Sequence, residues 1–413
     1  MTPDPPARAA DAATLLVAVT GRDRPGLTAR LFAALGDYPV DVLDVEQVTI
    51  RGRLVLGILI SAVPDPRGLR HALQEVAAEL GLEVEVTPGG GERRRRGGRA
   101  HVTVLGHPLQ PAAIASVAER IAATGANIDR ILRLAAYPVT SIELEVSGSD
   151  PARLRVELAA AALEHGIDLA VQPAGLARRA KRLVVMDVDS TLLQGEVIEL
   201  LAERAGVLGD VAQITAAAMR GELDFADSLR RRVRLLAGMP ASILDQVCRE
   251  VPLAAGARTL VRTLRRLGYQ LGVVTGGFTQ VTDHVVNELG IDYAAANTVE
   301  ISNGRLTGEL VGPILDRAGK AAALVRFAED AGVPLSQTVA VGDGANDLDM
   351  IAQAGLGVAF NAKPVVRDAA DAALSVPYLD ALLYLLGISR EEVEAADAAD
   401  GRPTPAPPVR RPC

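Results

Sequence analysis

The chain is poor in the residues that stabilise small secreted proteins, since its 413 residues include two cysteines, Cys248 and Cys413, and no tryptophan. Two cysteines cannot form a disulfide framework, so we expect the 49% of hydrophobic residues to build cores instead. No apolar run reaches the roughly 20 residues that span a bilayer, and residues 1–13 lack the apolar centre of a secretion signal. We therefore expect a cytoplasmic protein without a membrane partner.

Basic charge is also in short supply. The chain has 43 lysines and arginines against 51 aspartates and glutamates, which leaves a net charge of −8. Proteins that bind nucleic acid need a basic surface to contact the phosphate backbone, so we expect no nucleic-acid partner. A small anionic substrate needs only a locally positive pocket and is not excluded. The length is typical of a few domains, at roughly 100–200 residues each.

The first part of the chain carries the same order of elements twice. Residues 14–90 and residues 100–174 each show the hydrophobic pattern of β-α-β-β-α-β, which is typical of a ferredoxin-like unit. Residues 91–99 between them are rich in Gly and Arg and indicate a flexible linker, although their arginines could instead bind an anionic partner. Residues 1–13 are expected to be a disordered tail.

The pattern changes over residues 181–388, where four short apolar strands alternate with longer helices. This alternation is typical of a parallel α/β sheet. Residues of about 196–252 show helices only, which indicates a helical cap inserted between the first two strands. The Pro-rich residues 389–413 are expected to form a flexible tail. The predicted fold class is α/β, with a Rossmann-like parallel-sheet core and a helical cap, preceded by two ferredoxin-like units.

Acidic residues follow two of the apolar strands. Asp187 and Asp189 come after RLVVM, and alternation along a strand puts them on the same side. Asp343, Asn346 and Asp347 come after TVAVG. Ligands of open α/β sheets bind beyond the carboxyl ends of the strands, so the two groups converge if the strands are neighbours. Clustered carboxylates repel one another unless a cation lies between them, and oxygen ligands suit Mg²⁺.

Two further elements would complete a phosphate site. Thr275 and Gly276 follow the apolar residues of another strand, and a hydroxyl with a free backbone N–H there could hold phosphoryl oxygens. Lys320 begins a later helix and could neutralise phosphoryl charge. Each signal alone is weak, because the Asp pair could form a turn or a helix cap, and a lysine at a helix start is usually solvated. Together, in this order, they indicate phosphate-ester hydrolysis.

The segments DVDST, VVTGG and GDGAND, together with Lys320, resemble the four motifs of the haloacid-dehalogenase phosphatases. The resemblance implies that Asp187 is the nucleophile that forms an aspartyl phosphate, and that Asp189 is the general acid and base. It also implies that Thr275 and Lys320 hold the phosphoryl group. Thr275 stands where many members have serine, and both residues supply a hydroxyl.

The same resemblance implies a Mg²⁺ cofactor. Its ligands would be the carboxylates of Asp187 and Asp343 and the backbone carbonyl of Asp189, with Asp347 supporting them from nearby. The pattern also differs from that of the P-type ion pumps, which have DKTG at the nucleophile and need membrane helices.

The helical cap offers an acid and several bases. Glu196 lies at the start of its first helix, and Arg232 belongs to the run SLRRRVRL. Neither residue needs a function to explain it. The helix dipole favours an acid in the first turn, and the arginines can form a solvent-exposed helix face. Alternatively, Glu196 binds an ammonium and an arginine binds a carboxylate through two hydrogen bonds. The residues alone leave both interpretations open.

The segments DVDST, GEVIELLA, FADSLRRRV and TGGF resemble the phosphoserine phosphatases over residues of about 181–388. The resemblance implies that the substrate is O-phospho-L-serine and that the reaction is the last step of L-serine synthesis. The substrate-binding residues that it implies are Glu196 for the amine, Arg232 for the carboxylate, Met219 and Phe225 as an apolar lid, and Thr275, Gly276, Lys320 and Asn346. Two alternatives are a related phosphatase for another small ester or a phosphoprotein, and an amino-acid-binding regulator whose phosphatase site is vestigial.

The two ferredoxin-like units resemble ACT domains, which sense amino acids. The first unit has the segment GRDRPGLTARL, with Asp23 and Gly26 in its strand-to-helix turn. The second unit lacks this segment but has Asn127 after its first helix. The resemblance implies that L-serine binds near Asp23, Gly26 or Asn127 and inhibits the enzyme, and that the chain forms a homodimer. Alternatively, the two units only mediate dimerisation.

Overall fold

The computed structural model describes residues 14–89, 98–402 and 404. The predicted N-terminal tail and nearly all of the predicted linker lie outside these residues. The chain divides into two compact units, residues 1–96 and residues 97–413. Within the described ranges, no helix combines the length and the apolar character needed to cross a membrane.

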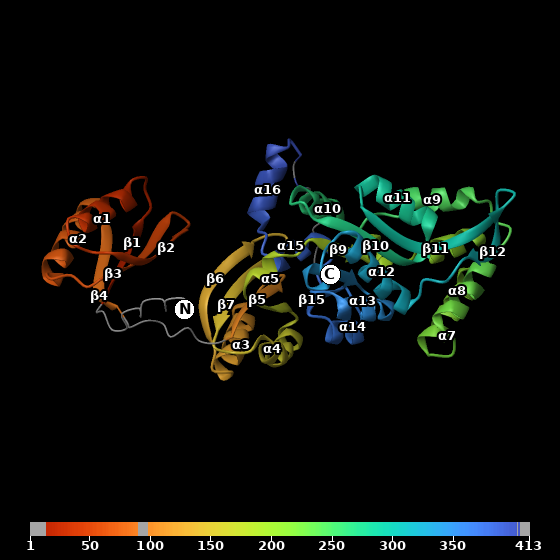
Figure 1. The fold of residues 1–413 in the computed structure, drawn as a ribbon, viewed down its shortest axis with the longest axis horizontal. Helices are drawn as coiled ribbons and strands as arrows, with labels where there is room; N and C mark the ends of the chain where they lie inside the picture. Colours follow the sequence, from red (N-terminus) through yellow and green to blue (C-terminus); the bar gives the residue numbers. More distant parts are fainter. Residues whose placement is uncertain (1–13, 90–97, 403, 405–413) are drawn as a thin grey trace, which may run out of the picture. The chain divides into compact units, whose positions relative to one another are not determined.

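The first unit is a four-stranded antiparallel sheet covered by two helices, as the sequence predicts (Figure 1). Its elements are β1 (Thr14–Arg22), α1 (Leu27–Gly36), β2 (Val42–Ile50), β3 (Arg53–Ser61), α2 (Pro66–Leu80) and β4 (Leu82–Gly89), with strand order β2-β3-β1-β4. Alternate residues of β3, from Leu54 to Ile60, are buried in the core of this unit. Helix α2 begins where the Asp65 side chain accepts a hydrogen bond from Gly68 N.

The second ferredoxin-like unit repeats this arrangement. Its elements are β5 (Arg99–Gly106), α3 (Pro111–Ala123), β6 (Asn127–Ala135), β7 (Thr140–Ser147), α4 (Pro151–His165) and β8 (Asp168–Pro173). The strand order is β8-β5-β7-β6, so the order of elements and the order of strands match those of the first unit. The predicted repeat is therefore confirmed.

The remaining strands form the predicted α/β core. They are β9 (Leu183–Met186), β10 (Gln270–Phe278), β11 (Tyr293–Ser302), β12 (Arg305–Val311), β13 (Thr338–Gly342), β14 (Gly357–Phe360) and β15 (Ala372–Leu374), in the order β12-β11-β10-β9-β13-β14-β15. All neighbours in this core are parallel except β11 and β12, which form an antiparallel hairpin. The four-strand pattern in the sequence missed this hairpin and β15, because their exposed or very short segments lack a continuous apolar run.

Helices cover the core and form the cap (Figure 1). The core helices are α10 (Ala257–Arg266), α11 (Thr279–Leu289), α12 (Arg317–Asp330), α13 (Leu348–Gln353), α14 (Pro364–Ala369) and α15 (Leu382–Leu385), and α5 (Leu176–Arg179) precedes β9. The cap helices are α6 (Val197–Ala205), α7 (Leu208–Met219), α8 (Phe225–Arg234) and α9 (Ser242–Glu250). The cap lies between β9 and β10, as predicted, and α8 packs beside β12.

The second ferredoxin-like unit and the α/β core share one sheet, which the sequence patterns did not predict. Strand β15 pairs with β8 through Ala372 and Ala170, so that eleven strands run continuously from β12 to β6. Two hydrogen bonds support the junction, since Ser375 N donates to Asp168 and Gln172 donates to the Leu385 carbonyl. The free backbone groups of edge strands allow such joining.

The prediction of a flexible tail over residues 389–413 is wrong for its first part. Helix α16 (Arg390–Ala399) begins at a capping box formed by Ser389 and Glu392, and it lies beside β6 (Figure 1). Asp397 is fully buried and accepts hydrogen bonds from Arg262 and Arg266 of α10. The prolines of this segment begin only at residue 403, whereas Ser389 and Glu392 supply a helix start. Residues 405–413 lie outside the described part of the chain.

Candidate active site

Asp187 lies directly beyond the carboxyl end of β9. Its backbone N–H donates to the Val341 carbonyl of β13, which brings the ends of the two parallel strands together. The side chain is 3% exposed, and its Oδ1 atom accepts hydrogen bonds from Val188 N at 2.8 Å and from Lys320 Nζ at 2.7 Å. The sheet therefore presents this carboxylate at its carboxyl edge, as predicted.

Asp189 reaches the same cavity by a different route from the predicted strand alternation. The strand ends at Met186, and Val188–Leu192 form a wide turn in which Ser190 has a positive φ of 59°. Within this turn, Asp189 accepts hydrogen bonds from Val197 N at 3.0 Å and from the Thr275 hydroxyl at 2.8 Å. Asp189 therefore connects the end of β9 with β10 and with the first helix of the cap.

The two acidic groups converge, because β9 and β13 are neighbours in the sheet. Carboxylate oxygens of Asp187, Asp343 and Asp347 all lie within 4.8 Å of one another. Asp347 is fully buried and accepts hydrogen bonds from Lys320 at 2.7 Å and from Gly344 N at 3.0 Å. Such a group of oxygen ligands can hold a metal ion.

The electrostatics of this cluster favour an added cation. Burial and the charge of Asp347 raise the pKa of Asp187 well above its usual range. Burial and Asp347 also raise the pKa of Asp343 to about 6. Burial opposes the charged form of Lys320, but Asp187 and Asp347 outweigh it and raise the pKa of this lysine. Lys320 therefore stays positively charged, but its single charge does not balance the negative charge of the whole carboxylate cluster.

Thr275 comes from a strand of the sheet, and Lys320 comes from a helix that packs on it. Thr275 is almost fully buried near the end of β10, where its hydroxyl accepts a hydrogen bond from Gly277 N at 2.8 Å. Lys320 lies in the first turn of α12, which Asp316 caps through a hydrogen bond from Gly319 N. A buried, capped helix start holds the ammonium in place, so the solvated-lysine interpretation is wrong here.

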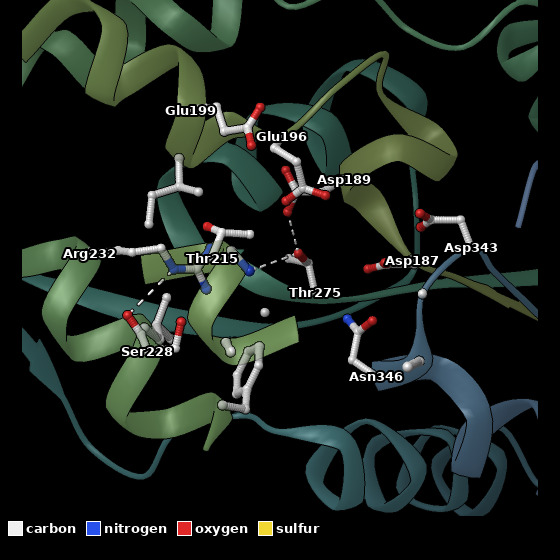
Figure 2. A pocket seen from close by; sticks show the side chains of 18 of the residues that line it. Asp187, Asp189, Glu196, Glu199, Thr215, Ser228, Arg232, Thr275, Asp343 and Asn346 are labelled. Atoms are coloured by element: carbon white, nitrogen blue, oxygen red, sulfur yellow. Dashed lines mark hydrogen bonds between the residues drawn. The ribbon is translucent and has the colours of Figure 1, made fainter. Parts of the chain in front are cut away.

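A cavity of about 370 Å³ lies between the core and the cap (Figure 2). The predicted site residues that line it are Asp187, Asp189, Glu196, Phe225, Arg232, Thr275, Gly276, Asp343 and Asn346. The cap closely approaches the core here, since a Cβ atom on Gly276 would lie 2.8 Å from Phe225 Cζ. Met219 ends α7, but its side chain lies outside what the structure describes.

Glu196 and Arg232 bring opposite charges to the cap side of this cavity. Glu196 accepts a hydrogen bond from the Ser190 hydroxyl at 3.3 Å. Two effects raise the pKa of Glu196 to about 7. The larger is the removal of water by the surrounding protein, and the smaller is the negative charge of Asp189 and Asp343. Burial lowers the pKa of Arg232, whose Nε donates to the Ser228 carbonyl at 3.4 Å. Two charged groups held near each other without pairing are suited to a ligand that carries both charges.

The chain matches known proteins over most of its length. Residues 184–352 match the haloacid dehalogenase-like hydrolase family, and residues 13–87 and 99–172 match ACT domain families. A phosphoserine phosphatase of Streptomyces coelicolor is 62% identical over 94% of this chain and 95% of its own length. The chain belongs to the phosphoserine phosphatase family. It is therefore a phosphoric monoester hydrolase.

Other members of the family agree with this assignment. A phosphoserine phosphatase of Mycobacterium tuberculosis is 52% identical over 94% of this chain and 96% of its own length. A crystal structure of a probable phosphoserine phosphatase from Vibrio cholerae, in unliganded form, is 35% identical and covers 73% of this chain and 88% of its own, with a TM-score of 0.55. The likeness to this family thus extends from the sequence to the fold.

Sequence reasoning missed several residues that position the site of this phosphoserine phosphatase family member. Thr191 donates to Asp343 at 3.2 Å, and Asn297 of β11 donates to the Gly276 carbonyl at 2.9 Å. The cavity wall also includes Glu199, Thr215 and Ser228 from the cap. Thr191, Glu199 and Ser228 belong to the segments DVDST, GEVIELLA and FADSLRRRV, so those motifs could have pointed to them, whereas Thr215 and Asn297 lie outside every quoted motif.

The three candidate regulatory residues occupy the turns where the sequence predicts them. Gly26 is the N-cap of α1 with a left-handed φ of 91°, a conformation that glycine adopts readily. Asp23 accepts a hydrogen bond from the Thr49 hydroxyl at 3.1 Å. Asn127 opens β6 and donates to the Ile128 carbonyl and to Asp129.

Proposed function

We propose that the protein hydrolyses O-phospho-L-serine to L-serine and phosphate, the last step of L-serine synthesis. The observation that carries this proposal is the composition of one cavity. Phosphoryl-handling residues line its core side, and Glu196 and Arg232 line its cap side (Figure 2). A phosphate ester that also carries an ammonium and a carboxylate matches this distribution of charge. The names of the family's members support the same substrate.

The first chemical step belongs to Asp187 and Asp189. A carboxylate oxygen of Asp187 attacks phosphorus, and the bond between phosphorus and the serine oxygen breaks. Asp189 donates the proton that the departing serine oxygen needs, from a position that Thr275 and Val197 N hold through hydrogen bonds. Lys320 contacts Asp187 and offsets the negative charge that accumulates near it.

The second step regenerates the enzyme. Asp189, now deprotonated, takes a proton from a water molecule whose oxygen attacks the phosphorus of the aspartyl phosphate. The bond between phosphorus and the Asp187 oxygen breaks, and phosphate leaves. Because the same side chain acts as acid and then as base, its position must stay constant. Its two hydrogen-bond donors, from β10 and from α6, support that requirement.

The acidic cluster fits Mg²⁺ as the cofactor. Its donors are all oxygens, and burial together with the negative charge of Asp347 raises the pKa values of Asp187 and Asp343, which a bound cation would offset. We propose the carboxylates of Asp187 and Asp343 and the Asp189 carbonyl as ligands, with Asp347 held beside them by Lys320. When bound, the ion would supply positive charge that reduces repulsion between the phosphoryl group and the nucleophile.

Metal removal tests this cofactor. Chelation with EDTA should abolish hydrolysis, and added Mg²⁺ should restore it. Mg²⁺ should also raise the melting temperature of the protein, because it relieves repulsion in the cluster. The Asp343→Asn variant is the matched control, since it should lose most of that thermal shift. A melting temperature that responds to Mg²⁺ equally in both proteins would contradict the ligand assignment.

The substrate is tested with a panel of esters. Phosphoserine should be the best substrate, followed at a distance by phosphoethanolamine, which lacks the carboxylate, and 3-phosphoglycerate, which has a hydroxyl in place of the amine. Phosphothreonine and an aryl phosphate test the size of the site. If another ester, or a phosphoprotein, has a higher kcat/KM than phosphoserine, the alternative of a related phosphatase is correct. Absence of any turnover would favour the vestigial regulator.

We propose that Glu196 binds the substrate ammonium, that Arg232 binds the carboxylate, and that Met219 and Phe225 form the apolar lid. The contact of Phe225 with Gly276 supports a lid at this place. Asn346 lines the cavity beside the acidic cluster, which supports its proposed contact with the substrate.

We propose that L-serine inhibits the enzyme through its ACT domains and that the chain acts as a homodimer. The ACT family matches and the left-handed turn at Gly26 support this regulation. Serine should then inhibit wild type with a component that is not competitive with the substrate. Asn127→Ala should weaken that component without changing kcat, and light scattering should give the mass of two chains. Purely competitive inhibition would indicate product binding at the active site instead.

A further inference from the structure

Ser228 lies in α8, one helical turn before Arg232, and lines the cavity (Figure 2). The residue is only 2% exposed. Among the residues that the structure describes, its hydroxyl finds no hydrogen-bond partner. Serine hydroxyls in helices commonly donate a hydrogen bond to the carbonyl one turn earlier, so a buried helical serine without this bond is unusual.

A buried hydroxyl without a partner is unfavourable by roughly 1–3 kcal/mol, and native proteins rarely keep one without a reason. Thr215 of α7 provides a contrast within the same cavity wall. Its hydroxyl donates to the Val211 carbonyl at 3.0 Å and is therefore satisfied within its own helix. The comparison indicates that the Ser228 hydroxyl is reserved for a partner that enters the cavity.

Arg232 indicates which partner that is. Its Nε donates to the Ser228 backbone carbonyl at 3.4 Å, which is long compared with the usual distance of about 2.9–3.0 Å. Such a weak bond is easily exchanged for a charge-assisted bond to a carboxylate. When the guanidinium turns to a carboxylate in the cavity, that group lies close to the Ser228 hydroxyl as well.

We infer that Ser228 is a specificity-determining residue, whose hydroxyl donates a hydrogen bond to the substrate carboxylate that Arg232 binds. This inference rests on the proposed function and deepens it. A carboxylate has two oxygens and can accept from both donors. Glu196 is a poor partner for Ser228, since its carboxylate accepts a hydrogen bond from the Ser190 hydroxyl, and Figure 2 shows the side chains of Glu196 and Ser228 apart from each other. An ester that lacks a carboxylate leaves the hydroxyl unpaired, which adds to the discrimination against it.

The test is the Ser228→Ala variant, measured with phosphoserine and with phosphoethanolamine. A hydrogen bond to a charged group contributes about 1.5–3 kcal/mol, so kcat/KM for phosphoserine should fall at least about tenfold. The kcat/KM for phosphoethanolamine should stay within about twofold of wild type. The matched control Thr215→Val removes a hydroxyl that is already satisfied, and it should leave the ratio of the two kcat/KM values unchanged.

Stability provides a second, independent readout. Because Ser228→Ala removes an unsatisfied buried hydroxyl, the melting temperature of the ligand-free protein should not fall. A lower melting temperature, or an equal loss of kcat/KM for both esters in an enzyme that prefers phosphoserine, would overturn the inference alone. A wild type that hydrolyses both esters equally well would contradict the proposed function and the inference together.

Discussion

Asp187, in the core half of the cavity, is almost fully buried and bonded to the buried Lys320, whereas in the cap half Glu196 is exposed and Arg232 is half-buried. A strand end and a capped helix hold the two core side chains. The cap side chains end in weak contacts of 3.3 and 3.4 Å. This difference agrees with the proposed division, in which the core half carries the reaction and the cap half selects the substrate.

The comparison has a kinetic consequence. Substitutions in the core half should lower kcat for every ester, and loss of Lys320, which pairs with Asp187 and Asp347, should also lower stability. Substitutions in the cap half should act mainly on KM, only for esters that carry the recognised group, and with little effect on stability. Each experiment below tests this division between the two halves of the cavity.

Asp187→Asn should have the largest effect. The amide keeps the shape of the side chain but is not a nucleophile, so kcat should fall at least about 10,000-fold for all esters. The variant should also fail to form a beryllofluoride adduct, while circular dichroism shows an unchanged fold. Retained turnover would mean that another residue attacks phosphorus.

Lys320→Met should affect both activity and stability. It leaves Asp187 and Asp347 buried without their cation, and breaking a buried ion pair destabilises a protein by roughly 3–5 kcal/mol. The kcat should fall roughly 100- to 1,000-fold for phosphoserine and the aryl phosphate alike. Urea unfolding measures the stability, and added Mg²⁺ should recover part of it. A stability equal to that of wild type would contradict the structural half of the comparison.

Arg232→Lys should act on the cap half alone. Lysine cannot form two parallel hydrogen bonds to a carboxylate, so kcat/KM for phosphoserine should fall roughly 10- to 100-fold, mainly through KM. The value for phosphoethanolamine should change little. Stability should stay within about 0.5 kcal/mol of wild type, because the side chain is partly exposed. A similar loss for both esters would show that Arg232 serves the chemistry rather than recognition.

Acidic pH should produce the smallest effect, through Glu196. Its pKa of about 7 means that this carboxylate, the proposed ligand of the ammonium, becomes protonated and loses its charge as the pH falls below 7. The kcat/KM of phosphoserine relative to 3-phosphoglycerate should therefore fall up to about tenfold from pH 8 to pH 6. The ratio removes pH effects that both esters share. Glu196→Gln should make the ratio independent of pH, and a flat ratio in wild type would exclude Glu196 as the ammonium ligand.

Much of the core half could be predicted because its residues follow strand ends in a recognisable order. Asp187, Thr275 and Asp343 needed only the rule that parallel strands present their carboxyl ends at one edge. The cap half was less accessible, because Glu196 and Arg232 equally fit a solvated helix surface until the fold placed both at one cavity. The flexible tail was predicted from the prolines alone, and the capping-box pattern of Ser389 and Glu392 at the start of α16 was overlooked.

Local patterns and short motifs in the sequence predicted the order of the domains, the repeated ferredoxin-like units and the candidate side chains for the chemistry. Only the folded chain shows that β8 and β15 join two domains in one sheet, that Asn297 donates to the Gly276 carbonyl, and that the buried Ser228 hydroxyl has no partner among the described residues. These features depend on which distant segments meet. Hydrogen bonds and buried surfaces between such segments form only when the whole chain has folded, so no local pattern records them.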